Sequence, residues 1–207
     1  MDRIVLAALL VLLSSTLAYA QVANAPTRTV GDSWTYSKRL PHFGEETRVV
    51  KVDENSHVIV RPKSACPACL WFHDKDMTVI QVLDENGKSA EASLSNFGRI
   101  GIGMKMYQFP LEVKKTWRVE TYGLFRGENV PYIVECAVSA FEDVKTKAGT
   151  FKAFKIDQSW KIKTHFSNPP NWSDTIWYSP EVKNSIKFEG GGRNPQNWEL
   201  ISYSVKP

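Results

Sequence analysis

Two cysteines separated by two residues, in Cys66-Pro67-Ala68-Cys69, are the sharpest candidates for chemistry in the sequence. The sulfurs of a C-x-x-C motif can close a small ring, and a nearby positive charge or helix N-terminus can lower the pKa of the first thiol. Redox proteins of the thioredoxin type place this motif between a strand and a helix. Here extended segments are expected on both sides. We therefore favour a structural disulfide between Cys66 and Cys69 over a redox or metal site, with free thiols as a third interpretation.

A metal site is the weaker alternative for the same region. His73 lies four residues after Cys69, so Cys66, Cys69 and His73 could supply three ligands to zinc or cuprous copper. His57 and Cys136 are candidates for the fourth ligand. Cys136 lies in register with apolar residues of an expected strand, which is typical of a small buried side chain. No cofactor is predicted.

The sequence contains no motif strong enough to name a reaction. It has no G-x-S-x-G elbow, no phosphate-binding loop and no H-E-x-x-H. Asp74 and Asp76 flank Lys75 beside His73, a grouping that could serve acid–base chemistry or bind a hard cation. A polar turn is the interpretation that we favour. These observations favour a non-enzymatic protein with no catalytic residues.

Aromatic side chains are the other candidates for function. The chain has seven tryptophans, namely Trp34, Trp71, Trp117, Trp160, Trp172, Trp177 and Trp198. Large rings add buried area to a thin β core, and they can equally line a concave face that is open to a lipid or another hydrophobic ligand. The candidate binding residues are Trp71, Trp117, Phe154 and Trp160. The sequence leaves open whether these rings pack together or face a ligand.

The elements that must position these residues are strands. From Gln21 to Pro207 the chain has 38 Val, Ile and Thr residues against 20 Leu, Ala and Met residues, a composition typical of β-sheet. Phe154, Ile156, Trp160 and Ile162 alternate with polar residues, which indicates a half-buried antiparallel strand with these side chains facing inward. Ten strands are expected, at 34–39, 46–53, 57–61, 77–84, 115–122, 132–144, 154–162, 172–178, 185–189 and 198–205. We predict an all-β fold of about ten antiparallel strands in a strongly curved sheet, an open barrel or a sandwich.

Turn chemistry supports this fold. Asn86-Gly87 is a strong hairpin signal because both residues tolerate positive φ. The segments 53–56 and 147–150 are predicted turns as well. The segment from Ser93 to Met106 contains three glycines, so an irregular loop is expected there.

The first twenty residues are typical of a secretion signal. Arg3 precedes an apolar run from Ile4 to Leu13, and Ala18-Tyr19-Ala20 suits signal peptidase. We predict a signal peptide at 1–20 and one antiparallel β domain at 21–207, periplasmic or secreted. The apolar run is too short to be retained as a membrane span, and no second segment is long enough to cross a membrane, so none is expected after cleavage. The 26 basic and 22 acidic residues alternate along the chain, which disfavours nucleic-acid binding.

Several segments carry a family resemblance. They are Gly31–Tyr36, Phe109–Leu111, Glu142–Ile156, Trp177–Val182 and Glu199–Tyr203. This series resembles the TapB-like family of secreted bacterial β-rich proteins of unknown function, which is similar in turn to a broader group of envelope domains. The resemblance implies an exported, antiparallel, curved-sheet domain without an assigned activity. Lys147 stands where that family usually has Pro or Val, and the Cys66 and Cys69 pair lies outside the shared pattern.

The leading hypothesis is an exported soluble β-domain that binds a hydrophobic small molecule, a lipid or an envelope protein across its concave face. One alternative is a thiol, disulfide or metal-binding protein centred on Cys66 and Cys69. Another is a structural component of an envelope assembly. Whether Trp117, Phe154 and Trp160 fill the inner face or enclose a cavity would discriminate best among them.

Overall fold

The computed structural model describes residues 21–37, 46–52, 57–60, 69–90, 103–125, 128–165, 167, 171–191 and 197–207, with only the backbone described at 57–60 and 123–125. The predicted signal peptide at 1–20 lies outside these residues, as does the predicted turn at 53–56. The described residues contain no helix, and therefore none that is long and apolar enough to cross a membrane.

Strands account for all the regular structure in the described residues. They are β1 (Val22–Ala23), β2 (Ser33–Tyr36), β3 (Glu46–Val52), β4 (His57–Val60), β5 (Leu70–His73), β6 (Val79–Leu83), β7 (Leu111–Glu112), β8 (Thr116–Phe125), β9 (Glu128–Thr146), β10 (Gly149–Ile162), β11 (Trp172–Ser179), β12 (Asn184–Glu189) and β13 (Trp198–Ser204). Each of the ten predicted strands is present. The prediction missed β5, whose sequence Leu-Trp-Phe-His does not alternate between apolar and polar residues, and the two-residue strands β1 and β7.

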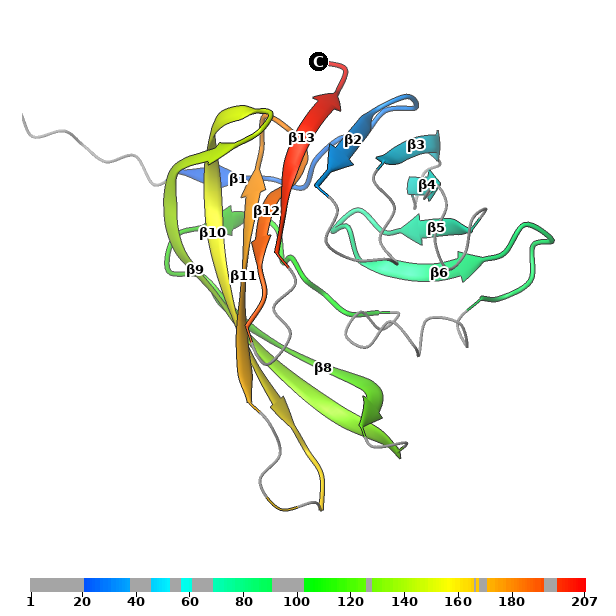
Figure 1. The fold of residues 1–207 in the computed structure, drawn as a ribbon, viewed down its shortest axis with the longest axis vertical. Coiled ribbons are helices and arrows are strands. Elements are labelled where there is room, and N and C mark those ends of the chain that lie inside the picture. Colours follow the sequence, from blue (N-terminus) through cyan, green and yellow to red (C-terminus); the bar gives the residue numbers. More distant parts are fainter. Residues whose placement is uncertain are drawn as a thin grey trace, which may run out of the picture.

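Eleven of these strands form one antiparallel sheet with the order β6-β5-β4-β3-β2-β13-β12-β11-β10-β9-β8. The sheet consists of two meanders, β2 to β6 and β8 to β13, which the pairing of β13 with β2 joins. Figure 1 shows the short strands of the first meander on one side and the long strands of the second on the other. In the part of the chain that the structure describes, β6 and β8 end the sheet and do not pair with each other. The prediction of an all-β fold with a strongly curved antiparallel sheet is thus confirmed, and the sheet is open.

A tight hairpin joins the two longest strands, β9 and β10. Thr146 pairs with Gly149, whose φ of 143° is costly for any residue with a Cβ atom. The Thr146 hydroxyl donates to the Gly149 carbonyl at 3.2 Å and accepts from the Ala148 backbone N–H. The predicted turn at 147–150 is therefore confirmed. The turn at Asn86-Gly87 is confirmed as well, since Gly87 has a φ of 74° and Leu83 bridges to Ser89.

One face of the second meander carries the main core, and we call it the inner face. It is the face of β10 that carries Phe154, Ile156, Gln158, Trp160 and Ile162, all of which are buried. Burial of each large apolar side chain contributes about 1.5–3 kcal/mol.

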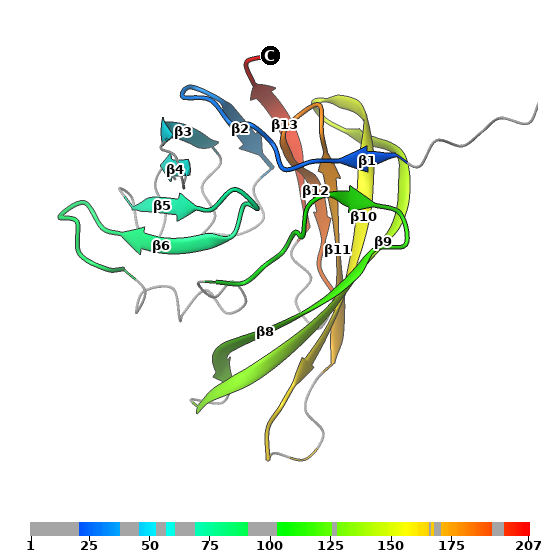
Figure 2. The same cartoon turned by 180° about the vertical axis from the view of Figure 1, so that it is seen from behind.

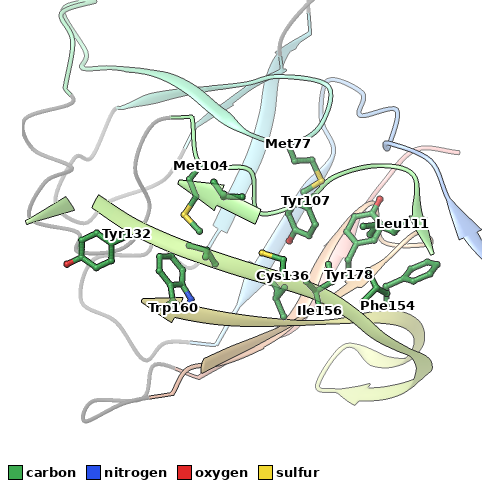
Figure 3. Close-up of a cluster of buried hydrophobic side chains, with 14 of the residues drawn as sticks. Met77, Met104, Tyr107, Leu111, Tyr132, Cys136, Phe154, Ile156, Trp160 and Tyr178 are labelled. Carbon is green, nitrogen blue, oxygen red and sulfur yellow. The ribbon is translucent and has the colours of Figure 1, made fainter. Parts of the chain in front are cut away.

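The chain outside the second meander covers this face. Met77 from the β5–β6 turn and Met104 and Tyr107 from the segment before β7 pack against it, and Figure 3 shows these side chains above the strands that carry Cys136, Ile156 and Tyr178. The short pair of β1 and β7 lies across the long strands (Figure 2) and adds Ala23 and Leu111 to the same cluster. The inner face is therefore packed by protein where Phe154 and Ile156 lie.

Candidate ligand-binding site

Strand register arranges the inner face of β8 to β11 in rows. Directly opposed residues of neighbouring strands lie on the same face, with Cβ atoms about 5 Å apart. One row consists of Trp117, Cys136, Gln158 and Asp174. The next row consists of Val119, Val134, Trp160 and Trp172. We call the row of Trp117, Cys136, Gln158 and Asp174 the polar row. It places a thiol, an amide and a carboxylate side by side within an otherwise apolar and aromatic face.

Gln158 is the most unusual member of the polar row. It is 1% exposed, and the only interaction of its amide group is a weak one with the thiol of Cys136; neither its nitrogen nor its oxygen has an oxygen or nitrogen partner. The indole nitrogen of Trp160, two residues along the same strand, has no partner either. Leaving a buried polar group unsatisfied costs about 1–3 kcal/mol, and such groups are rare in folded proteins. The region between Gln158 and Trp160 is thus short of one or more polar partners.

Cys136 lies opposite Gln158 and is a free, buried cysteine. Burial raises the pKa of its thiol to about 12, although the amide of Gln158 opposes this effect in part. A thiol with so high a pKa is a poor nucleophile at neutral pH.

Asp174 closes the polar row at β11. Its carboxylate accepts a hydrogen bond from the backbone N–H of Gly191 at 2.8 Å. A Cβ atom at Gly191 would lie 2.0 Å from the carbonyl oxygen of Ser173, so only glycine fits this close approach. The backbone after β12 is therefore held against β11, and Asp174 is oriented by it.

Aromatic rings surround the polar row. Trp160 and Trp172 stack with ring centroids 5.5 Å apart, and the ring of Tyr132 meets each of them edge-on. Trp117, at the β8 end of the row, donates its indole N–H to the carbonyl of Lys105 at 3.1 Å. Trp117 and Trp172 are only half-buried. They form a rim where the aromatic face meets solvent.

The four aromatic residues predicted to bind a ligand do not form one group. Trp117, Phe154 and Trp160 belong to the inner face, whereas Trp71 packs with Cys69 and Val82 in a separate cluster of the first meander. Phe154 is fully buried and packs on Phe141 with centroids 4.6 Å apart, so it is a core residue. Of the four predicted residues, Trp117 belongs to the polar row and Trp160 to the row beside it.

Of the cysteine region, the structure describes Cys69 and His73 but not Cys66. Cys69 is fully buried and directly precedes β5, while Cys66 lies outside the described residues, so the predicted disulfide stays a prediction. His73 ends β5, and the strand rise separates it from Cys69 by about 13 Å. One ion cannot bridge that distance. No group of three or more potential metal ligands occurs among the residues that the structure describes.

Asp74 and its neighbours form a polar turn. The carboxylate of Asp74 accepts the backbone N–H groups of Asp76 and Thr78, at 2.9 and 2.8 Å. The Nδ1 atom of His73 is hydrogen-bonded to the Met77 carbonyl at 3.1 Å. These contacts hold Met77 at a φ of 64°, and Met77 packs into the main core. The carboxylate of Asp74 thus serves the turn rather than proton transfer.

An open depression of about 550 Å³ lies over β8 to β11. Three of its lining residues, Trp117, Cys136 and Gln158, belong to the polar row, and the exposed residues Thr116, Arg118, Glu135 and Ser173 also line it. Glu135 is paired with Lys161 at 2.9 Å, so the exposed part of this lining is charged and solvated.

The sequence prediction missed Gln158, although a signal was present. Gln158 occupies an inward position of the period-two strand, in register with Ile156 and Trp160. A polar residue at such a position either has a buried partner or marks a site. Asp174 could not be found in this way, because its register depends on the pairing of β10 with β11.

Comparison with known proteins gives fold-level likenesses only. No protein-family model and no curated protein matches the chain. Among solved structures, a predicted lipoprotein from Parabacteroides distasonis is 14% identical with a TM-score of 0.44, covering 89% of this chain and 100% of its own. The hypothetical lipoprotein YmcC from Escherichia coli is 7% identical with a TM-score of 0.43, covering 86% of this chain and 88% of its own. A predicted exported protein with a YmcC-like fold from Bacteroides fragilis is 13% identical with a TM-score of 0.38, covering 88% of this chain and 99% of its own. With TM-scores below 0.5, these likenesses carry no argument about function.

Proposed function

We propose that this protein is an exported, non-enzymatic binding protein that holds an uncharged amphipathic molecule against the inner face of β8 to β11. The observation that carries the proposal is the Gln158 amide, which is buried beside the rings of Trp160, Trp172 and Tyr132 with the weakly interacting Cys136 thiol as its one partner. The leader at residues 1–20 supports export.

The chemistry of the face indicates the class of ligand. Stacked and edge-on aromatic rings favour an apolar body. The amide of Gln158 supplies one acceptor and two donor hydrogens, and the indole of Trp160 supplies one donor. A ligand with an alkyl or ring portion and one amide or hydroxyl group satisfies both parts. The rim of Trp117 and Trp172 is where such a molecule would enter.

The alternatives receive less support from the described residues. The thiol or metal alternative is centred on Cys66 and Cys69, and with Cys66 outside the described residues no contact supports it. For Cys66 and Cys69 we retain the proposal of a structural disulfide. The predicted envelope partner remains a second possible occupant of the concave face, but no contact in the described residues favours it.

The test begins with the wild-type protein and an uncharged dye, N-phenyl-1-naphthylamine, whose fluorescence rises in apolar sites. We expect the dye to bind and decanamide to displace it. The variant Gln158→Met should weaken displacement by decanamide about tenfold, the equivalent of one lost hydrogen bond. The matched control is Gln81→Met, because Gln81 is exposed on β6 and far along the sheet; it should behave as wild type.

Two results would count against the proposal. The first is a wild-type protein that neither binds the dye nor releases an apolar molecule on organic extraction. The second is a Gln158→Met variant that binds decanamide as wild type does, because the amide would then have no part in recognition.

A further inference from the structure

A second buried polar group without an adequate partner lies at the other end of the molecule. Arg28, in the segment between β1 and β2, is 2% exposed. Its Nη1 atom has no hydrogen-bond partner. A guanidinium group remains charged at any physiological pH and has five N–H donors to satisfy. Buried charges in proteins are normally paired with an opposite charge.

The contacts that Arg28 does make are weak. Its Nε and Nη2 atoms donate to the Lys183 carbonyl at 3.4 and 3.3 Å, at the long end of the hydrogen-bond range. Its guanidinium carbon lies 5.0 Å from the centroid of the Trp34 ring, which is a cation–π contact. Neither contact neutralises the charge, and burial lowers the pKa of the guanidinium, which is the direction expected of an under-compensated cation.

The nearest carboxylate does not provide the missing charge. Asp32 is fully buried, and its two oxygens accept the backbone N–H groups of Thr29 and Lys206 at 2.8 and 2.9 Å. It forms no ion pair with Arg28, and both of its oxygens are already engaged by backbone N–H groups. Asp32 therefore ties the C-terminal end of the chain to the segment before β2, and Arg28 is left without an anion.

Hydroxyl groups surround the guanidinium instead. The side chains of Tyr178, Tyr36 and Tyr107 are close enough to act on it electrostatically. Tyr107 is hydrogen-bonded to the Ser185 hydroxyl, and Tyr36 donates to the Ser185 carbonyl at 3.0 Å. Burial raises the pKa of Tyr107 to about 12 and also raises that of Tyr178, so both phenols are neutral at physiological pH. Because Tyr36 and Tyr107 are engaged with Ser185, the hydroxyl that adds a donor beside the charged Arg28 is that of Tyr178.

We propose that Arg28, with Trp34 beneath it and Tyr178, Tyr36 and Tyr107 around it, is a binding site for the anionic group of a ligand, a carboxylate or a phosphate. Both anions accept two parallel hydrogen bonds from a guanidinium fork. The anion takes Nη1 and replaces the long hydrogen bonds to Lys183, so the turn from Pro180 to Lys183 must give way when it enters. This site is independent of Gln158, and neither proposal rests on the other.

The wild-type protein provides the first test, made with the full chain after export and purification. Its melting temperature is measured in sodium chloride, inorganic phosphate and octanoate at matched ionic strength, together with the tryptophan emission that Trp34 contributes. We expect phosphate or octanoate to raise the melting temperature above the chloride value, because a ligand that binds only the folded state stabilises it. The anion that raises the melting temperature shows whether the site binds a phosphate or a carboxylate. If no anion exceeds chloride, the proposal is overturned and Arg28 is a structural residue.

Variants assign the effect to Arg28. Arg28→Met should abolish the anion-dependent shift, and Arg28→Lys should weaken binding about tenfold to a hundredfold, since a lysine cannot form the bidentate fork. The control is Arg48→Met, because Arg48 lies on the surface with its side chain 59% exposed; it should keep the full shift. A shift that survives in Arg28→Met contradicts the proposal. If Arg28→Met does not fold, Tyr178→Phe takes its place and should reduce the shift without removing it.

A further arm distinguishes a lipid headgroup from a small anion. Vesicles of phosphatidylglycerol and of phosphatidylcholine are incubated with wild type and with Arg28→Lys, and the bound protein is sedimented. Sedimentation of wild type with phosphatidylglycerol alone, reduced in Arg28→Lys, indicates a lipid phosphate. A shift with soluble phosphate or octanoate but no sedimentation indicates a small ligand. The uncharged dye and decanamide test the Gln158 face separately.

Discussion

The two halves of the inner face of β10 differ although they belong to one strand. Phe154 and Ile156 are fully buried, face Met77, Tyr107 and Leu111, and have no polar atom to satisfy. Gln158 and Trp160 are also buried, yet three of their side-chain polar atoms have no oxygen or nitrogen partner, and only the Cys136 thiol interacts with the amide. Burial alone therefore does not separate core from site. What separates them is whether the groups that are buried find partners within the protein.

The apolar half should be the more costly to disturb. Replacing Phe154 by Ala removes a ring that packs on Phe141 and leaves a cavity, so the free energy of unfolding should fall by about 3–5 kcal/mol. Urea denaturation measures this. The control Lys152→Ala, at an exposed position of the same strand, should stay within about 0.5 kcal/mol of wild type. A loss below about 1 kcal/mol for Phe154→Ala would mean that the apolar half is not the core described here.

The free energy of unfolding should depend on pH through Cys136, which lies opposite Gln158 in the polar half. The pKa of Cys136 is raised to about 12 in the folded protein, above its unfolded value. The stabilisation is therefore complete below the unfolded pKa, about 8.5, and is lost as the pH rises towards 12. The free energy of unfolding of wild type should fall relative to that of Cys136→Ala by about 1.4 kcal/mol per pH unit in this range.

Calorimetry between pH 8 and 10.5 measures this difference. The phenol of Tyr107 titrates in both proteins and so cancels in the comparison. Parallel pH profiles for wild type and Cys136→Ala would show that the thiol is not held in its protonated form by burial.

The smallest effect, and the one of opposite sign, is expected at Gln158. Gln158→Met removes two unsatisfied polar atoms and keeps the volume, so the free energy of unfolding should stay level or rise by about 1 kcal/mol in the absence of ligand. The exposed counterpart Gln81→Met should change it by less than about 0.5 kcal/mol. A clear loss of stability in Gln158→Met would show that the amide has partners in the protein, and the contrast between the two halves of β10 would disappear.

The fold was largely predictable from local patterns. Alternation with a period of two, β-branched composition and Asn-Gly or Ala-Gly turns act between neighbouring residues, and all ten predicted strands were found. The candidate site was less predictable. Of the four residues predicted to bind a ligand, Trp117, Phe154 and Trp160 lie on the inner face and Trp71 lies in a different cluster, while their role in binding stays a prediction. Membership in a cluster depends on which elements cover a face, and local sequence does not encode that.

The sequence by itself determined the class of fold, the strand boundaries to within a few residues and the inward register of β10. It could not show that Gln158 would lie beside Cys136 and Asp174, because three strands must pair in one register to form that row. Nor could it show that Arg28 would be buried under a turn some 155 residues later in the chain. Periodicity is a property of adjacent residues, whereas the partners of a buried polar group come from distant segments. Only the tertiary structure decided which buried polar groups lack an adequate partner.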